Sequence, residues 1–371
     1  REVSHLIDAG DYTAAMAARG QSFGVMAQLL RELTEPSRIT VNEAGKRIGI
    51  MHAGGLAPGM NTAARAAVRL GISRGHTMLG VRDGFPGLRD GRITELAWAD
   101  VEAWTADGGA NLGLRRTIPG IEELYPIGRQ LENHQVDALL MIGGWNGYQA
   151  MYRLHDERDR YPAFRIPLMC VPASIDNNLP GSELAIGADT ALNVIVEAID
   201  RIKLSASATT RCYVVETMGR YCGYLALMAS IAGGCDYCLI PENPPAEGWE
   251  ERMCAELKRG RDAGRRDSIV IVAEGIGHSQ EIANEIQART GIDTRATILG
   301  HVQRGGSPTL RDRVNASAMG YHAVCLLEQG KYNRIVGMKG EELVDYPVDE
   351  ALEMTKSIDP VLVDVCNTIS I

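Results

Sequence analysis

Length, composition and charge describe a soluble globular protein. The chain has 371 residues, of which 45% are hydrophobic and 23% charged, and this balance argues against a disordered chain. Aspartate and glutamate number 47 against 38 lysines and arginines, so the formal net charge is −9, the opposite of the basic surplus typical of nucleic-acid binders. No apolar run reaches the ~18 residues of a membrane-spanning helix, and the N-terminus lacks a signal-peptide pattern. We therefore expect a cytoplasmic protein without a nucleic-acid or membrane partner.

The predicted elements change in character along the chain. Residues 1–36 show two polar-faced helical patterns that end at Pro36, and from Arg47 onward short apolar runs alternate with longer helical patterns. Strands are predicted at 48–52, 77–81, 138–142, 167–171, 213–216, 238–240, 268–273 and 296–299, helices at 61–73, 188–203, 224–231, 280–290 and 317–327, and a hairpin appendage at 330–347. This alternation predicts an α/β fold with two lobes of mostly parallel sheet flanked by helices, preceded by a helical linker.

Five loops near the ends of these predicted strands have unusual sequences. Ligands of parallel α/β folds bind beyond the carboxyl ends of the strands, so these loops are the places to examine. They cover residues 52–61, 143–147, 173–178, 216–220 and 297–306. In this order, and together with the block 187–231, they resemble the phosphofructokinase family from about Arg47 to Gly320.

The resemblance implies how the chain is organised. It implies a helical linker at 1–40, a nucleotide lobe at 41–180 on which 307–371 packs, and a lobe for fructose 6-phosphate at 181–306. Ala14–Phe23 resembles the connection between the halves of duplicated phosphofructokinases, which implies the C-terminal, regulatory half of a tandem enzyme. The alternative is an ordinary N-terminal helical extension. The resemblance also implies an oligomer, with a tetramer expected, because the family borrows phosphate-binding arginines across a subunit interface.

The predicted nucleotide site lacks metal ligands. Working members of the family carry an aspartate after each of two Gly-Gly pairs, and Mg²⁺ prefers such hard oxygen ligands. Here Leu56 and Trp145 occupy those positions, and Asn146-Gly147 replaces a Gly-Ser pair. We therefore expect a degenerate nucleotide site formed by Gly54, Leu56, Trp145, Asn146 and Gly147, with no metal or cofactor in this half and with ATP and Mg²⁺ bound by a separate catalytic half. The alternative is that Leu56 and Trp145 only pack while the phosphoryl donor binds in another way.

The predicted sugar-phosphate site, in contrast, is complete. Phosphate dianions in a chain of charge −9 need local arginines, whose guanidinium groups bind phosphate in bidentate fashion. The resemblance implies that two of these arginines reach in from a neighbouring subunit, and they correspond to Arg211 and Arg295. The full predicted set is Arg116, Ser174, Ile175, Asp176, Asn177, Asn178, Arg211, Met218, Gly219, Arg220, Glu274, Arg295, His301, Val302, Gln303 and Arg304.

Asp176 and Arg116 decide between binding and catalysis. Asp176 matches the family's general base, but Asn178 stands where working halves carry a second acid, and Ser174 replaces a usual threonine. Without a metal-bound donor, we interpret Asp176 as a hydrogen-bond acceptor for sugar hydroxyls. Arg116 matches an arginine that in regulatory halves is available for a second phosphate.

Three functions follow. The first is a regulatory half that binds fructose 2,6-bisphosphate, or fructose 6-phosphate, as an effector and acts on a catalytic N-terminal half and on other subunits. The second is a working kinase with an altered donor site that keeps Asp176 as base. The third is an assembly subunit that binds no ligand. Product formation separates the second from the first, and calorimetry with sugar phosphates separates the third.

Overall fold

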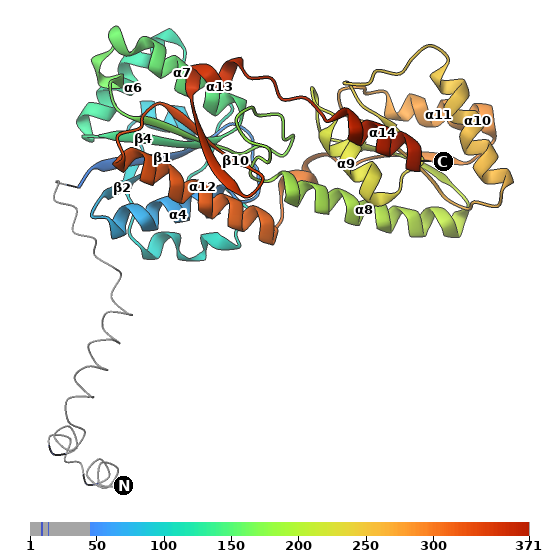
Figure 1. The fold of residues 1–371 in the computed structure, drawn as a ribbon, viewed down its shortest axis with the longest axis horizontal. Helices are drawn as coiled ribbons and strands as arrows, with labels where there is room; N and C mark the ends of the chain where they lie inside the picture. Colours follow the sequence, from blue (N-terminus) through green and yellow to red (C-terminus); the bar gives the residue numbers. More distant parts are fainter. Residues whose placement is uncertain (1–8, 10–13, 15–44, 371) are drawn as a thin grey trace.

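The structure is a computed structural model that describes residues 45–370 together with Ala9 and Ala14. Apart from these two positions, the helical linker predicted for 1–40 lies outside the described residues. The described chain forms two β-sheets that lie side by side, each covered by helices (Figure 1). This is the mixed α/β architecture with mostly parallel sheets that the sequence predicts. No helix among residues 45–370 is long and apolar enough to cross a membrane.

The first sheet has seven strands. Their order is β11-β10-β5-β4-β1-β2-β3. The strands are β1 (Arg47–Ala53), β2 (Thr77–Val81), β3 (Ile93–Glu95), β4 (Ala138–Gly143), β5 (Leu168–Pro172), β10 (Arg334–Lys339) and β11 (Glu342–Pro347). The central strands pair in parallel, and only β3 and β11 run antiparallel to their neighbours.

The second sheet is smaller and entirely parallel. Its order is β7-β8-β6-β9, formed by β6 (Cys212–Thr217), β7 (Tyr237–Leu239), β8 (Ser268–Ala273) and β9 (Thr294–Ile298). Every residue of β8 is buried, as expected for a strand covered on both faces.

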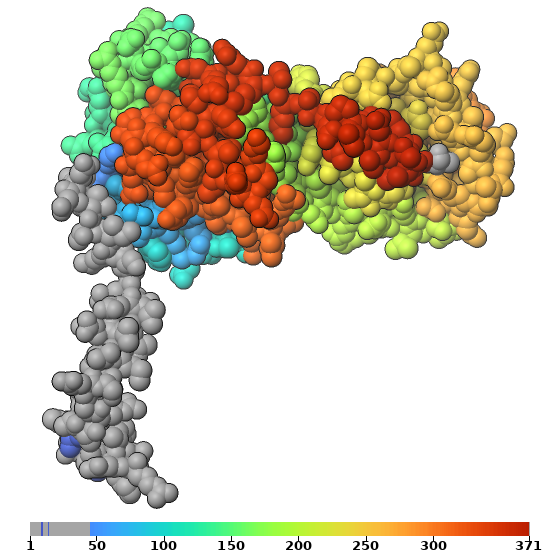
Figure 2. Space-filling view, in the orientation of Figure 1, coloured from blue at the N-terminus to red at the C-terminus, as the bar shows by residue number. Residues whose placement is uncertain are grey.

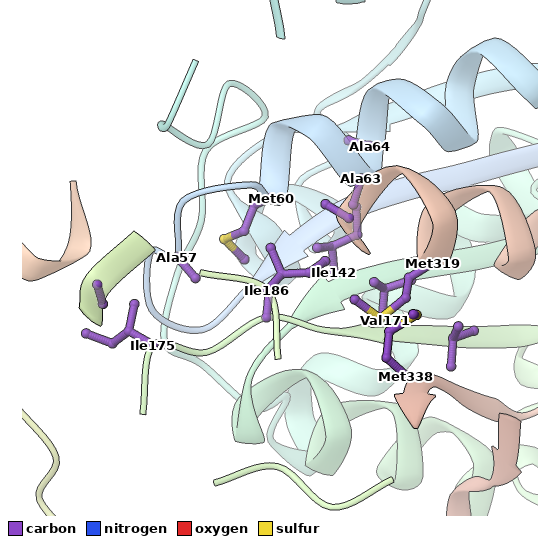
Figure 3. Packing of buried hydrophobic residues seen from close by; sticks show 14 of the residues in the cluster. Ala57, Met60, Ala63, Ala64, Ile142, Val171, Ile175, Ile186, Met319 and Met338 are labelled. Atoms are coloured by element: carbon purple, nitrogen blue, oxygen red, sulfur yellow. The ribbon is translucent and has the colours of Figure 1, made fainter. Parts of the chain in front are cut away.

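Both faces of the first sheet are packed against helices. Ile48 and Ile50 of β1 belong to one apolar cluster, and Met51 and Ala53 to another, because successive side chains of a strand point to opposite faces. Figure 3 shows the first cluster where Met60, Ala63 and Met319 meet Ile142 and Val171 of the sheet. The helices around this sheet are α4 (Met60–Ser73), α5 (Gly84–Arg89), α6 (Ile121–Asn133), α7 (Trp145–Asp156), α12 (Leu310–Glu328) and α13 (Val348–Glu353).

The helices of the second sheet are α8 (Ala188–Thr209), α9 (Tyr224–Gly233), α10 (Trp249–Asp262), α11 (Ser279–Thr290) and α14 (Pro360–Ile369). Met253 of α10 and Ile282 of α11 pack with Val214 and Val270 on one face. On the other face, α8 and α9 join the same cluster that covers the first sheet, so one core runs through both lobes. Four short 3-10 helices complete the described fold: η1 (Ala99–Thr105), η2 (Glu157–Asp159), η3 (Pro162–Phe164) and η4 (Gly300–Arg304).

Two parts of the C-terminal region differ from the sequence prediction. The hairpin of β10 and β11 is not an appendage, because Arg334 and Ile335 pair in parallel with β5 and extend the first sheet. Residues 307–371 also do not all pack on the first lobe. The last helix, α14, packs against α9 and β7, and the buried Cys366 donates a hydrogen bond to Ser230. The chain therefore returns across both lobes before it ends (Figure 2).

Asp312 joins the two lobes at the N-terminus of α8. Its buried carboxylate accepts hydrogen bonds from the backbone N–H groups of Gly187 and Thr190, each at 2.8 Å, and from the Thr190 hydroxyl. Thr309 caps α12 by accepting from the Asp312 N–H. This cap explains why α12 starts at Leu310, seven residues before the predicted start.

Candidate functional site

Loops from both sheets enclose a cavity of about 270 Å³. The loops after β1, β4 and β5 of the first sheet meet the loops after β6 and β8 of the second sheet there, which is where parallel α/β folds place ligands. The cavity is lined by Gly55, Arg116, Gly144, Trp145, Asn146, Ala173, Ser174, Asp176, Asn178, Met218, Arg220, Tyr221, Glu274 and Arg304.

Arg304 and Arg116 approach the same point of the β1 loop. A Cβ atom on Gly55 would lie 3.0 Å from Nη1 of Arg304 and 3.2 Å from Nη2 of Arg116. Glycine is therefore the residue that lets both guanidinium groups come close to this backbone. Arg304 also donates from Nη1 to the Leu56 carbonyl at 3.2 Å. Burial lowers the pKa of Arg304, and the Asp176 carboxylate opposes that change.

Arg220 forms an ion pair with Glu274 on another wall of the cavity. Its Nη2 lies 3.0 Å from Glu274 Oε1, and this hydrogen bond raises the pKa of Arg220. The neighbouring Met218 is fixed through its backbone, because its N–H donates to the side-chain oxygen of Gln303 at 3.1 Å. Gln303 is fully buried and donates to the Gly300 carbonyl at 2.9 Å.

Polar atoms in the cavity wall lack partners within the described part of the chain. Oδ1 of Asp176, Oδ1 of Asn178 and Nε of Arg304 are all buried without a hydrogen bond among residues 45–370. Burial raises the pKa of Asp176, although Arg304, Arg116 and Arg220 lower it again in part. Unpaired buried polar atoms are costly, so these two acceptors and one cationic donor are available to a ligand that carries hydroxyl and anionic groups.

The structure places Trp145 at the cavity and Leu56 beside it. Trp145 is the first residue of α7, is 37% exposed, and makes an edge contact with Tyr148 at 6.1 Å between ring centroids. Leu56 packs against the core, and its backbone carbonyl accepts the hydrogen bond from Arg304. Neither side chain has an oxygen atom for a metal ion, and residues 45–370 contain no group of three His, Cys, Asp or Glu side chains arranged to bind one. The residues present at these two positions therefore do not fit Mg²⁺ with a nucleoside triphosphate.

The other residues of the predicted nucleotide site have structural positions. Asn146 lines the cavity next to Trp145. Gly54 has a left-handed φ of 94°, and its N–H donates to the Arg115 carbonyl at 3.0 Å. Gly147 is buried in the first turn of α7.

Arg211 and Arg295 lie away from this cavity. Arg211 precedes β6 and Arg295 is the second residue of β9, whereas the cavity adjoins the opposite ends of these strands, about 20 Å away along β6 and about 10 Å away along β9 by strand geometry. Both arginines contact one carboxylate: Arg211 Nε lies 2.6 Å from Asp293 Oδ2, and Arg295 Nη2 lies 3.1 Å from Asp293 Oδ1. The hydrogen bond with Asp293 raises the pKa of Arg211.

Several predicted site residues do not line the cavity. Ile175 is buried in the core, and Asn177 points into a different cavity. His301 and Val302 are exposed on η4. Gln303 is buried, and its side-chain oxygen accepts a hydrogen bond from the Met218 N–H. Gly219 adopts a left-handed φ of 118°, where an added Cβ would lie 2.2 Å from the Cys222 carbonyl.

Sequence reasoning missed four lining residues, namely Gly55, Gly144, Ala173 and Tyr221. The side chain of Tyr221 is 83% exposed and directly follows Arg220. Gly55 and Gly144 are the second glycines of the two Gly-Gly pairs. The pairs themselves were therefore the sequence feature that could have identified these two residues as part of the cavity. Backbone that approaches two arginines closely is a reason for glycine that does not depend on a nucleotide.

Comparison with known proteins gives a family match and several relatives. Residues 47–327 match the family model described as Phosphofructokinase. An ATP-dependent 6-phosphofructokinase of Bacillus cytotoxicus is 42% identical over 85% of this chain and 96% of the relative. The solved structure of Pichia pastoris phosphofructokinase in the T-state is similar with a TM-score of 0.86 and 28% identity, and that of Saccharomyces cerevisiae phosphofructokinase with 0.84 and 27%. This chain is covered to 100% and 99% in these two comparisons, but it spans only 45% and 53% of the two yeast chains.

Proposed function

This chain belongs to the phosphofructokinase family of glycolytic kinases, and we propose that it is the regulatory half of a cytoplasmic tandem 6-phosphofructokinase. In this proposal the cavity binds fructose 2,6-bisphosphate, or fructose 6-phosphate, as an allosteric effector. The half lacks its own site for ATP and Mg²⁺, and a catalytic half supplies the transfer from ATP to fructose 6-phosphate.

One observation carries the proposal. The cavity contains three arginines, Arg116, Arg220 and Arg304, together with two unpaired buried oxygens. At the two positions expected to bind a metal ion, it offers the side chains of Leu56 and Trp145, neither of which is a carboxylate. Arginines suit the phosphates, and the oxygens of Asp176 and Asn178 suit sugar hydroxyls as hydrogen-bond acceptors. A phosphoryl donor would need charge neutralisation by a metal ion, for which these positions offer no ligand.

The tandem arrangement is supported by length. The chain covers about half of each of the two yeast phosphofructokinase chains to which it is similar, while it covers nearly all of the bacterial relative. Both findings are expected if this sequence is one of two family units within a longer chain.

The binding roles can be assigned residue by residue. Arg116 and Arg304 lie on the Gly55 side and would hold one phosphate, while Arg220 lies against Glu274 near the other end of the sugar. Arg211, which is half-buried, and Arg295, which is exposed, both pair with Asp293. In this proposal they complete the phosphate site of a neighbouring subunit of an oligomer, which we expect to be a tetramer. In this proposal Asp176 accepts a hydrogen bond from a sugar hydroxyl group and does not act as a base.

Titration calorimetry and a product assay on the same preparation test the proposal. We expect fructose 2,6-bisphosphate to bind, and we expect no fructose 1,6-bisphosphate when the chain is given fructose 6-phosphate with ATP. Trp145 lines the cavity, so its fluorescence provides a second measure of binding, with the Trp145→Phe variant as control. Formation of fructose 1,6-bisphosphate would overturn the non-catalytic assignment, and absence of heat with either sugar phosphate would favour an assembly subunit.

A second candidate function rests on Asp176. Its buried carboxylate has a raised pKa and stands at the position of the family's base, so a working kinase with an unusual donor site would use it to accept the proton of the sugar hydroxyl. This alternative predicts product with ATP, GTP or pyrophosphate that disappears in the Asp176→Asn variant.

A further inference from the structure

The loop 174–178 is a wall between two cavities. Asp176 and Asn178 line the sugar-phosphate cavity, whereas the side chain of Asn177, between them in sequence, faces a second cavity of about 730 Å³. Asn177 has a left-handed φ of 50°, which turns its side chain away from those of its neighbours. Whatever holds Asn177 therefore also fixes the direction of the Asp176 and Asn178 side chains.

Both ends of the Asn177 side-chain amide form hydrogen bonds. Its Nδ2 donates to the Glu183 carbonyl at 3.0 Å, and its Oδ1 accepts from the Ala185 N–H at 2.8 Å and from Nζ of Lys356 at 2.8 Å. The first two partners are local in sequence. Lys356 is 179 residues away and belongs to the segment between α13 and α14.

Lys356 uses one of its donors on this wall and the other two on the segment that follows it. Besides Asn177, its Nζ donates to the Ser182 carbonyl at 2.7 Å and to the Glu183 carbonyl at 2.9 Å, and an ammonium group has three N–H donors. Burial lowers the pKa of Lys356 to about 8, although Cys222 and Glu183 oppose the change. A lysine with three short bonds in a largely buried position has a fixed geometry, unlike the exposed Lys339 that lines the same cavity.

The segment that carries Lys356 crosses between the lobes. Residues 354–359 connect α13, which contacts α7 and the first sheet, to α14, which contacts α9 and β7 (Figure 1). The segment therefore connects Lys356, and through it the 174–178 wall, to elements of both lobes.

We propose that Lys356 is a positioning residue of the sugar-phosphate cavity, which holds the 174–178 wall through Asn177 and links its geometry to the segment 354–359. The identity of the ligand rests on the proposed function above. The placement of the wall by Lys356 does not.

Hydrogen exchange and calorimetry on the whole chain test this role. We compare Lys356→Met, which keeps an unbranched side chain one atom shorter and without donors, with Lys339→Met, the matched change of an exposed lysine at the same cavity. We expect faster amide exchange at 174–178 in Lys356→Met, unchanged exchange at 268–273 in β8, and an affinity for fructose 2,6-bisphosphate about tenfold lower, which corresponds to one hydrogen bond to a charged group. Lys339→Met should match the unchanged protein, and Lys356→Arg should restore part of the affinity.

The result can contradict the proposal in separate ways. Exchange and affinity in Lys356→Met equal to those in Lys339→Met would overturn it, and so would a uniform rise in exchange along the chain. If Lys356→Met does not fold, Asn177→Gly removes the acceptor and tolerates the left-handed φ, and the same local pattern is expected. If the unchanged chain binds no sugar phosphate, the proposed function fails, while the exchange comparison still decides whether Lys356 positions the wall.

Discussion

Arg304 donates a hydrogen bond to the main-chain oxygen of Leu56, and the 3.2 Å contact joins an arginine of the second lobe to the loop after β1 of the first. The resemblance seen in the sequence implies a metal-binding aspartate at this position in working members of the family. Here the loop contacts the arginine through its backbone, and this contact does not depend on the side chain at position 56.

Gly55→Ala tests that close approach. The added Cβ would stand 3.0 Å from Arg304 and 3.2 Å from Arg116, so both guanidinium groups must shift by a few tenths of an ångström. We expect an affinity for fructose 2,6-bisphosphate about tenfold lower, comparable with a weakened charged hydrogen bond, measured by calorimetry. Gly305→Ala is the matched control, because its Cβ would meet only the Val302 carbonyl at an ordinary 3.9 Å. Equal affinities of the two variants would argue against the crowding at Gly55.

Asp176→Asn tests the buried acceptor through pH. Burial raises the pKa of Asp176 above its ordinary value of 3.8, so the folded state binds a proton more readily than the unfolded state. Protonation of Asp176 should therefore increase the wild-type free energy of unfolding as the pH falls from the raised pKa toward 3.8. At neutral pH, where the carboxylate is charged, this stabilisation is absent.

Urea unfolding of both proteins between pH 4 and 8 measures this difference. The Asn variant should be the more stable of the two at neutral pH and should lack the contribution at low pH. Its sugar-phosphate affinity should fall at least about tenfold, since it loses a charged acceptor. A variant less stable than the wild type at neutral pH would show that the carboxylate is stabilising in the unliganded cavity.

Arg211→Ala tests whether a neighbouring subunit completes the site. The change leaves Asp293 paired with Arg295, so the local charge stays compensated. In the tandem enzyme we expect activation by fructose 2,6-bisphosphate to be lost, measured as turnover against effector concentration. Arg201→Ala, which removes an exposed arginine paired with Glu197 on α8, should leave the activation curve unchanged. Normal activation of Arg211→Ala would exclude this arginine from the effector site.

Asp312→Ala tests the connection between α12 and α8. The change leaves the N–H groups of Gly187 and Thr190 and the Thr190 hydroxyl buried without their acceptor. We expect a loss of about 3 kcal/mol in the free energy of unfolding, because each unpaired buried donor costs about 1–3 kcal/mol. Denaturant titration measures the loss, and Asp364→Ala on the exposed face of α14 provides the control. A change within about 0.5 kcal/mol would show that water replaces the carboxylate.

The sequence predicts the strands better than the helices. Apolar runs such as 268–273 coincide with β8 because a strand buried on both faces leaves a continuous hydrophobic signal. The helices α6 and α7 were not predicted, because Pro126 lies inside the first and Gly147 lies in the first turn of the second. The place of β10 beside β5 depends on tertiary pairing, which no local pattern records.

The candidate site shows the same division. The topology rule brings the loops with Asp176, Arg220 and Arg304 to one cavity because they follow parallel strands. The rule does not say which way each loop side chain points. Asn177 has a left-handed φ and faces the other cavity. Gln303 is turned inward and accepts a hydrogen bond from the Met218 N–H. Both orientations depend on the backbone conformation, which the residue type alone does not give.

One apolar cluster extends from Ile48 of the first sheet to Ile271 of the second, by way of Ile195 and Ile199 on α8. Close-packed interiors resist gradual deformation, so we expect the two lobes to keep their position relative to each other. In the proposed regulatory role, an effector that binds between the lobes would move them together, as one rigid body, relative to neighbouring subunits. The effect of binding would then be a shift at the surfaces where this proposed half contacts the rest of the enzyme.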